Sequence, residues 1–208
     1  MASTPRRARY ECLESDTKLK ALTGMTGLII LAAIDAAYET FDVVDEQLVP
    51  RGTQPFAQLV ELANLSSMLG NLLGAGLAKH SEGRYERSGP HKYQDLRSTS
   101  GGEHVEIKTA LEANRPKGHL AKAGIYLTFR YVLAGRDGSY ERGTRGDTVF
   151  VWEVRVGDLT EADFSESNTP GDSGKTAVVK NEVFKGMERV YFDSTFFPYA
   201  KLDGPWGE

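Results

Sequence analysis

The stretch from Lys92 to Ala110, KYQDLRSTSGGEHVEIKTA, constrains the fold more than any other part of the chain. Polar and apolar side chains alternate on both sides of a turn-rich centre, which runs from Ser98 to Gly102. A period of two is typical of a half-buried strand, because successive side chains point to opposite faces of a sheet. Small and polar residues such as those at the centre favour a tight turn. The sequence therefore predicts a β-hairpin.

The register of this hairpin brings two acidic side chains together. If the turn is centred between Ser100 and Gly101, residues whose numbers sum to 201 lie opposite each other. The expected pairs are Asp95 with Glu106, Tyr93 with Lys108, and Leu96 with Val105. Opposed side chains have Cβ atoms about 4.5–5.5 Å apart, and like charges placed there are destabilising. Two facing carboxylates therefore need a physical reason.

A divalent cation is one such reason. Mg²⁺ takes oxygen ligands and is commonly held by one or two carboxylates plus waters and substrate phosphate. Lys108 lies two residues beyond Glu106, on the same face of the strand, where its ammonium can reach a phosphate oxygen or an attacking water. In the alternative interpretation, Lys108 only neutralises the two acids in a surface charge cluster. Spacing alone leaves both interpretations open.

Asp95 followed eleven positions later by Glu106-Ile107-Lys108 resembles the PD-(D/E)xK nuclease superfamily. The wider context GPHKYQDLRSTSGGEHVEIKT is most similar to small, PvuII-like type II restriction endonucleases, and the resemblance extends from about Glu82 to Leu159. The sequence departs from the superfamily pattern at one position, since Gln94 and not proline precedes Asp95.

The resemblance implies a site and a cofactor. Asp95, Glu106 and Lys108 would be the catalytic residues, and Mg²⁺ would be the cofactor. Its ligands would be the two carboxylates and the main-chain carbonyl of Ile107. A metal ion in such a site lowers the pKa of bound water and stabilises charge on a phosphate. Lys108 would orient or help to deprotonate the water.

The expected fold class is α/β (α+β), with a mixed central β-sheet of the restriction-endonuclease-like type, flanking helices and an N-terminal helical region. The 208 residues fit one domain, with 1–81 mainly helical and 82–208 forming the catalytic sheet core. Hydrophobic content of 40% and charged content of 26% are typical of a globular protein with a real core.

Two long helices are expected before the hairpin. Ser15 and Asp16 can cap the first, which should run to about Val44, and the second should run from about Pro55 to His80. The segment 28–34 is apolar nearly all round, which indicates either a core helix or a dimer interface. Glu61 on the second helix is either the further acid that many nucleases of the superfamily carry or part of a solvated face.

Several strands are expected after the hairpin. They are predicted at Ile125–Leu133, Thr148–Val156, near Thr176–Phe184 and at Arg189–Phe192. A short helical or turn segment should open at Asp158.

A polar, basic segment follows the predicted catalytic strand. It is the candidate DNA-binding segment, with residues Asn114, Arg115, Lys117, His119 and Lys122. Asn and Arg can bond base edges in the major groove, whereas Lys suits phosphates. A polar crossover loop would have much the same composition. The basic connection 81–92 before the hairpin is likewise either a phosphate contact or a solvated loop.

The overall charge argues against an avid nonspecific nucleic-acid coat, since the formal net charge is −4. It does not exclude a DNA enzyme, because phosphate contacts need only a local basic surface. The single cysteine, Cys12, cannot form an intrachain disulfide, so a reducing cytoplasm is expected. The uncharged run from Ala21 to Ile34 is too short to span a bilayer.

These features predict a type II restriction endonuclease that hydrolyses double-stranded DNA with Mg²⁺ at specific sequences. A homodimer is expected, because a twofold protein matches a palindromic site, and segment 28–34 is its candidate interface. One alternative is a PD-(D/E)xK nuclease of DNA repair or junction processing. Another is a noncatalytic DNA-binding or assembly protein whose carboxylates are only structural.

Overall fold

The computed structural model describes residues 5–89, 94–167 and 176–199. The α-helices are α1 (Thr17–Thr23), α2 (Gly27–Leu48), α3 (Phe56–Leu59), α4 (Leu62–His80) and α5 (Asn181–Gly186). The strands are β1 (Tyr85–Arg87), β2 (Leu96–Ser98), β3 (Val105–Leu111), β4 (Lys117–Gly118), β5 (Gly124–Ala134), β6 (Thr148–Leu159), β7 (Phe164–Ser167), β8 (Thr176–Val179) and β9 (Glu188–Phe192). Short 3-10 helices lie at Tyr10–Cys12, Val49–Arg51, Glu161–Asp163 and Ser194–Phe196.

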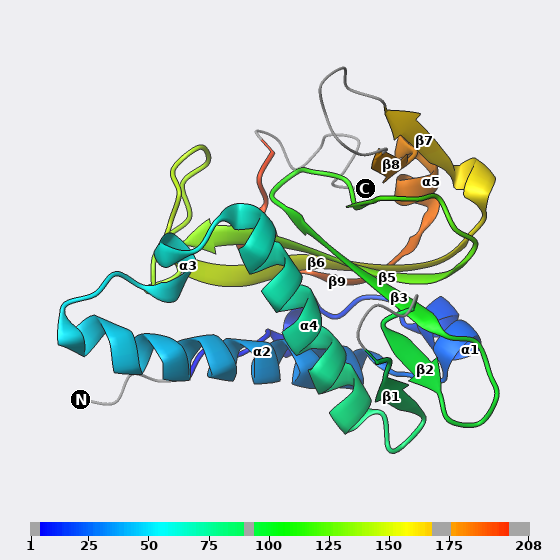
Figure 1. Ribbon diagram of the computed structural model, residues 1–208, viewed down its shortest axis with the longest axis horizontal. Helices are drawn as coiled ribbons and strands as arrows, with labels where there is room; N and C mark the ends of the chain where they lie inside the picture. Colours follow the sequence, from blue (N-terminus) through cyan, green and yellow to red (C-terminus); the bar gives the residue numbers. More distant parts are fainter. Residues whose placement is uncertain (1–4, 90–93, 168–175, 200–208) are drawn as a thin grey trace.

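The strands form two sheets (Figure 1). The larger has the order β1-β2-β3-β5-β6-β9, with β3 and β5 parallel and the other neighbours antiparallel. The smaller has the order β4-β8-β7. Helices α2 and α4 cross each other beside the larger sheet. The predicted fold class, a mixed sheet with flanking helices and a helical N-terminal region, is confirmed.

The predicted hairpin register is also confirmed, because Leu96 on β2 lies opposite Val105 on β3. The first strand is shorter than expected, since β2 begins at Leu96. The expected pair of Tyr93 with Lys108 falls outside the described residues. Asp95 therefore lies just before β2. Within the described residues, the pairing of β2 with β3 ends at Leu96 and Val105.

Alternation along β3 and β5 separates the two faces of the larger sheet. Val105, Ile107 and Leu127 belong to the main hydrophobic core, which also contains residues of α2 and α4. Tyr126 lies on the opposite face and packs in a second cluster with Phe164 of β7 and residues of β8 and α5. Side chains two residues apart share a face, so Glu106 and Lys108 lie on the face of the sheet opposite the core that contains α2 and α4.

The single long helix predicted from Asp16 to Val44 is wrong. The chain breaks after α1, where Gly24 takes a left-handed conformation (φ 68°), and α2 leaves at 86° to α1. Acidic side chains accept hydrogen bonds from backbone N–H groups at the start of both helices. Asp16 Oδ2 accepts the N–H of Gly27 at 3.0 Å, and Glu188 Oε2 on β9 accepts the N–H of Lys18 at 2.7 Å.

The second predicted helix is divided into α3 and α4, with a break at Val60 and Glu61. Its end at His80 is as predicted. The glycines in α4 permit close packing and do not break the helix. A Cβ atom on Gly76 would lie 2.8 Å from Ala33 Cα on α2, so the two backbones nearly touch.

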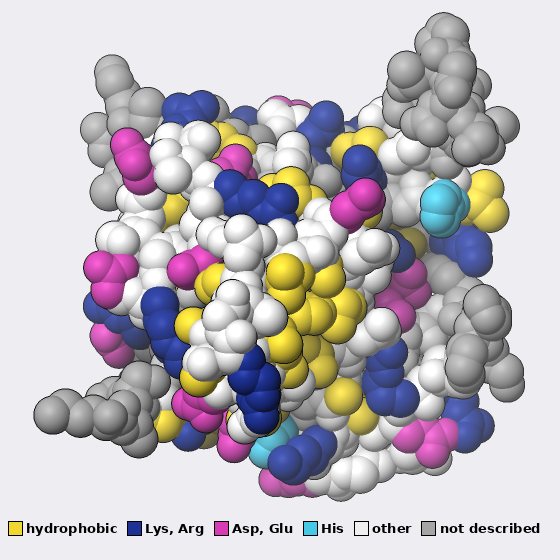
Figure 2. All heavy atoms as spheres, turned by 60° about the vertical axis from the view of Figure 1, so that its left-hand side comes forward, with side chains coloured by type: hydrophobic (Ala, Val, Ile, Leu, Met, Phe, Trp, Pro, Cys, Tyr) yellow, Lys and Arg dark blue, Asp and Glu magenta, His cyan; other side chains and the backbone are white. Residues whose placement is uncertain are grey.

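The apolar segment 28–34 belongs largely to the core. Ile30, Ala33 and Ile34 have no exposed surface, whereas Leu28 is 60% exposed. Other large apolar side chains of the helical region are also exposed, namely Val43, Val49, Leu59, Leu62 and Met68. Figure 2 shows hydrophobic side chains gathered in one area of the face it presents, with Lys and Arg side chains around them.

Three strand predictions need correction. The basic connection after α4 contains a strand, β1, which pairs with β2. The strand predicted from Thr176 to Phe184 ends at Val179, and α5 follows it. β6 continues to Leu159, so the short helical segment starts later, with a capping box between Thr160 and Asp163.

A buried ionic cluster holds α5 against the larger sheet. Glu153 on β6 bonds Arg130 Nε at 2.6 Å and Arg155 Nη2 at 2.9 Å, and all three side chains are at most 5% exposed. Arg155 also donates to the carbonyl of Met187 at 3.1 Å, just after α5. Burial of paired charges requires such additional hydrogen bonds. The strand patterns in the sequence do not indicate that these three charged side chains meet.

No single helix among the described residues has the length and apolar character needed to cross a membrane. Among the described residues, one pair of consecutive helices, Thr17–Thr23 and Gly27–Arg51, has this length and apolar character when taken together, and it is bent by 86° at the break.

The α2–α4 contact generates a paired prediction. Gly76→Ala should destabilise the protein by about 1–3 kcal/mol, because the added methyl group meets the backbone of Ala33. Gly70→Ala on the same helix is the matched control. Its methyl group would meet only the Thr109 side chain at 3.7 Å, so helix propensity should stabilise the protein by up to about 1 kcal/mol. Urea unfolding of both variants measures the difference, and equal effects would refute the close approach.

Candidate functional site

Asp95 completes the hydrogen bonding of β3 with its side chain. Its Oδ2 accepts the backbone N–H of Ile107 at 2.8 Å, directly beyond the Leu96–Val105 pair. A carboxylate thus occupies the position that a strand carbonyl would take if β2 continued. This bond fixes the Asp95 side chain beside the β3 backbone.

Glu106 is held by two donors from different parts of the site. Its Oε2 accepts the backbone N–H of Gln94 at 3.0 Å, and its Oε1 lies 2.5 Å from Lys108 Nζ. Glu106 is only 8% exposed, so these contacts replace much of its hydration. The predicted triad of Asp95, Glu106 and Lys108 is therefore brought together in space.

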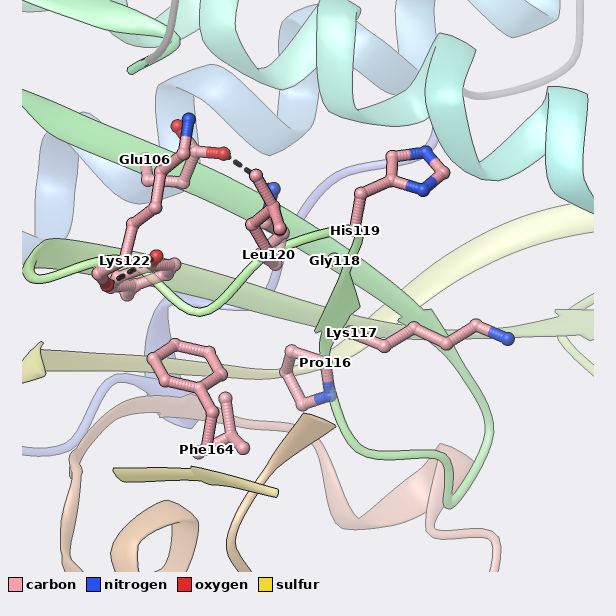
Figure 3. Close-up of a pocket in the computed structure, with 11 residues that line it drawn as sticks. Glu106, Pro116, Lys117, Gly118, His119, Leu120, Lys122 and Phe164 are labelled. Carbon is pink, nitrogen blue, oxygen red and sulfur yellow. Dashed lines mark hydrogen bonds and ion pairs between the residues drawn. The ribbon is translucent and has the colours of Figure 1, made fainter. Parts of the chain in front are cut away.

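The triad lies on the wall of a groove of about 1300 Å³. One wall belongs to α4, where Ser66, Gly70 and Asn71 line it, and the far wall belongs to segment 113–119. A smaller adjoining pocket of about 160 Å³ also has Glu106 and Lys108 in its lining. Figure 3 shows this smaller pocket, with Glu106 on one side and the segment from Pro116 to Lys122 on the other, and the Lys117 side chain extends away from Glu106. The acids are therefore not part of a convex, solvated charge cluster.

The predicted DNA-binding segment borders the same space. Asn114, Arg115, Lys117 and His119 line the groove, and Lys122 lines the adjoining pocket. Asn114, Lys117 and His119 are exposed. Arg115 is not, since it is half-buried and its Nη1 donates to the carbonyl of Val179 at 2.8 Å. Arg115 thus ties this segment to β8, which is a structural role.

Glu61, the acid considered on the second helix, does not join the triad. It is the exposed N-cap of α4, outside the groove lining. Ser66, Gly70 and Asn71 occupy the groove wall instead, and the sequence analysis missed them. The available signal was a spacing of four residues, which separates Ser66 from Gly70 and Ser67 from Asn71, because residues four apart lie one above the other on a helix.

The oxygen atoms at this site suit a hard divalent cation. Asp95 Oδ1 has no hydrogen-bond partner within the described residues, and Glu106 supplies a second carboxylate. Ile107 offers its N–H to Asp95, and a strand residue points its N–H and carbonyl to the same side, so the Ile107 carbonyl faces this side too. Asp95, Glu106 and the Ile107 carbonyl would hold Mg²⁺, which retains several waters of its own. Clusters of three or more His, Cys, Asp or Glu suited to a metal are absent from the described ranges, so this donor set has only two acids.

No protein-family model matches the chain, and no curated protein matches it.

The residue before Asp95 has an unusual backbone. Gln94 has φ 68°, the left-handed region that side chains other than glycine seldom adopt. Its N–H is the donor to Glu106 Oε2. Proline has φ near −65° and no N–H, so it could provide neither feature. The departure from the superfamily pattern at this position is therefore part of how the site is held together.

This geometry predicts opposite results for two substitutions. Gln94→Pro should cost about 1–3 kcal/mol from the lost donor to buried Glu106 alone, with further strain from the changed φ. Gln94→Gly should keep the fold, because glycine adopts positive φ without steric cost. Urea unfolding checks both variants. A Gln94→Pro variant as stable as the wild type would contradict the observed backbone at this position.

Proposed function

We propose that the protein is a Mg²⁺-dependent endodeoxyribonuclease of the type II restriction class, which hydrolyses phosphodiester bonds in double-stranded DNA at specific sequences. The observation that carries this proposal is the convergence of Asp95, Glu106 and Lys108 on the wall of one groove. Two carboxylates and an ammonium with this connectivity are the set that the PD-(D/E)xK resemblance requires.

The charge distribution across the groove supports a nucleic-acid substrate. Lys117 and His119 lie on the wall opposite the acids, and Lys122 lies beside them. The chain as a whole is acidic, with net charge −4, so a local basic wall is the surface on which a phosphate backbone would be favoured.

Each side chain of the triad has a distinct role in the proposed reaction. Mg²⁺, when bound, supplies a water of lowered pKa and stabilises negative charge on the phosphate. Asp95 and Glu106 hold it, and their positions are set by backbone N–H groups of Ile107 and Gln94. Lys108 orients the attacking water and stabilises charge as it develops on the phosphoryl oxygens. Its present contact with Glu106 Oε1 keeps the ammonium beside the reacting position.

A homodimer belongs to the same proposal, because two symmetry-related sites would cut the two strands of a palindrome. Segment 28–34 is not a suitable interface, since Ile30, Ala33 and Ile34 are fully buried within one copy. Sedimentation or light scattering of the purified chain measures the oligomeric state directly.

DNA cleavage tests the proposed function. The purified chain is incubated with plasmid and phage DNA in Mg²⁺ or EDTA, and discrete fragments are expected in Mg²⁺ only. Lys108→Ala should slow cleavage about 10²- to 10⁴-fold, as expected for loss of a group that positions and activates water. Lys79→Ala is the matched control, because Lys79 is exposed in the last turn of α4 and does not line the groove. It should cleave like the wild type.

The other outcomes separate the alternatives. Cleavage of branched or damaged DNA without discrete fragments from plasmid would favour a repair or junction nuclease. If the Lys108→Ala variant cleaves DNA as fast as the wild type, the assignment of the catalytic site is wrong. No cleavage of duplex, branched or single-stranded DNA would overturn the nuclease proposal and favour a binding or assembly role.

A further inference from the structure

Asn71 on α4 projects into the groove from the wall that carries no charged side chain. It is exposed and shares the groove lining with Asp95, Glu106 and Lys108. The neighbouring α4 residues in that lining are Leu62, Ala63, Ser66, Ser67 and Gly70. Asn71 therefore has the largest hydrogen-bonding side chain on this wall.

The orientation of the Asn71 amide follows from its partner. Arg87 Nη2 lies 2.9 Å from Asn71 Oδ1. A guanidinium carries only donors, so the amide oxygen and not the amide nitrogen must face it. The two N–H groups of the Asn71 side chain are then directed away from Arg87, where they are available to a ligand in the groove.

Arg87 is itself fixed from two sides. It lies on β1 opposite Leu96, next to the strand that Asp95 precedes. Its guanidinium rests against α4 at Gly74, where a Cβ atom would come within 1.8 Å of Nη1. Glycine at this position lets the guanidinium approach the helix, and Arg87 Nη1 is buried there. The Arg87–Asn71 bond is thus held by the β1–α4 contact.

We propose, on the basis of the nuclease function above, that Asn71 donates a hydrogen bond to a phosphate oxygen of the bound DNA strand and that Arg87 is its positioning residue. Adenine recognition by Asn uses the amide oxygen and nitrogen together. The bond from Arg87 directs the oxygen toward β1, so the amide nitrogen with its N–H groups is the part that meets a ligand, and a phosphate oxygen can accept from it. The contact then sets the position of the DNA beside Asp95 and carries no sequence information.

An isosteric substitution tests this assignment. Asn71→Asp keeps the shape and the Arg87 contact but replaces the groove-facing donor with a charged acceptor. The dissociation constant for a fluorescein-labelled duplex in EDTA should rise about 10- to 100-fold. Asn64→Asp, which adds the same charge at an exposed position of α4 outside the groove lining, should change it less than twofold. Urea unfolding should show that Asn71→Asp is at least as stable as the wild type.

The role of Arg87 is tested by a double-mutant cycle. Arg87→Lys retains a positive charge but cannot reproduce the guanidinium contact, so it should weaken DNA binding in the wild-type background. In an Asn71→Ala background the same substitution should cause no further loss, because Arg87 acts through Asn71. A purely structural Arg87 would weaken binding equally in both backgrounds.

The results that would overturn the Asn71 assignment differ from those that would overturn the nuclease function. Unchanged affinity in Asn71→Asp, or equal losses in Asn71→Asp and Asn64→Asp, would overturn the phosphate contact while wild-type cleavage leaves the nuclease function intact. An altered fragment pattern in Asn71→Asp would mean that Asn71 reads a base and would also overturn the assignment. A wild-type chain that neither binds nor cleaves DNA would overturn both proposals.

Discussion

The carboxylates of Asp95 and Glu106 are the constraint on which the site depends. Each accepts the backbone N–H of the residue next to the other acid, which keeps two like charges at one groove, and Glu106 is only 8% exposed. The fold offsets the cost of placing them there with fixed donors, since each acid accepts a backbone N–H and Glu106 also pairs with Lys108. The Asp95 bond takes the place of a strand contact, so the side of β3 beyond Val105 faces the groove. The hydrogen bond that holds Asp95 therefore lies at the same part of β3 that lines the groove.

The rest of the fold supports that side of β3 from two directions. Packing of α2 against α4 through Gly76 and Ala33 fixes the helix wall, and Thr109 on β3 is bonded to the α4 backbone at Ser66. The other wall depends on the smaller sheet, in which β4 pairs with β8 and so carries Lys117 to the groove. The buried Glu153 cluster anchors the chain around α5, which follows β8. Both walls are therefore set by contacts remote from the acids.

Structural features that depend on neighbouring residues could be predicted from the sequence. Features that depend on contacts between distant residues could not. The hairpin register followed from a short turn and strict alternation, so the Leu96–Val105 pair was predictable. The break at Gly24 was missed, because Asp16 was assigned only to the start of one long helix, whereas its side chain also accepts the N–H of Gly27 at the start of α2. Arg130 and Glu153 lie in two separately predicted strands, and nothing local indicates that their side chains meet. The spacing along α4 could have placed Asn71 on one side of the helix, but its contact with Arg87 on β1 is not visible in the sequence.

Gln94 takes a backbone conformation that the proline expected from the superfamily resemblance could not adopt. A proline before Asp95 would restrict φ to negative values and remove a donor. This chain uses a positive φ instead, and the N–H of Gln94 then reaches Glu106. A left-handed residue other than glycine carries a cost of order 1–3 kcal/mol, which the surrounding contacts must offset. The bond to a buried carboxylate is such a contact, because a charged acceptor strengthens it. The backbone conformation of Gln94 and the placement of the Glu106 side chain are therefore linked by one hydrogen bond.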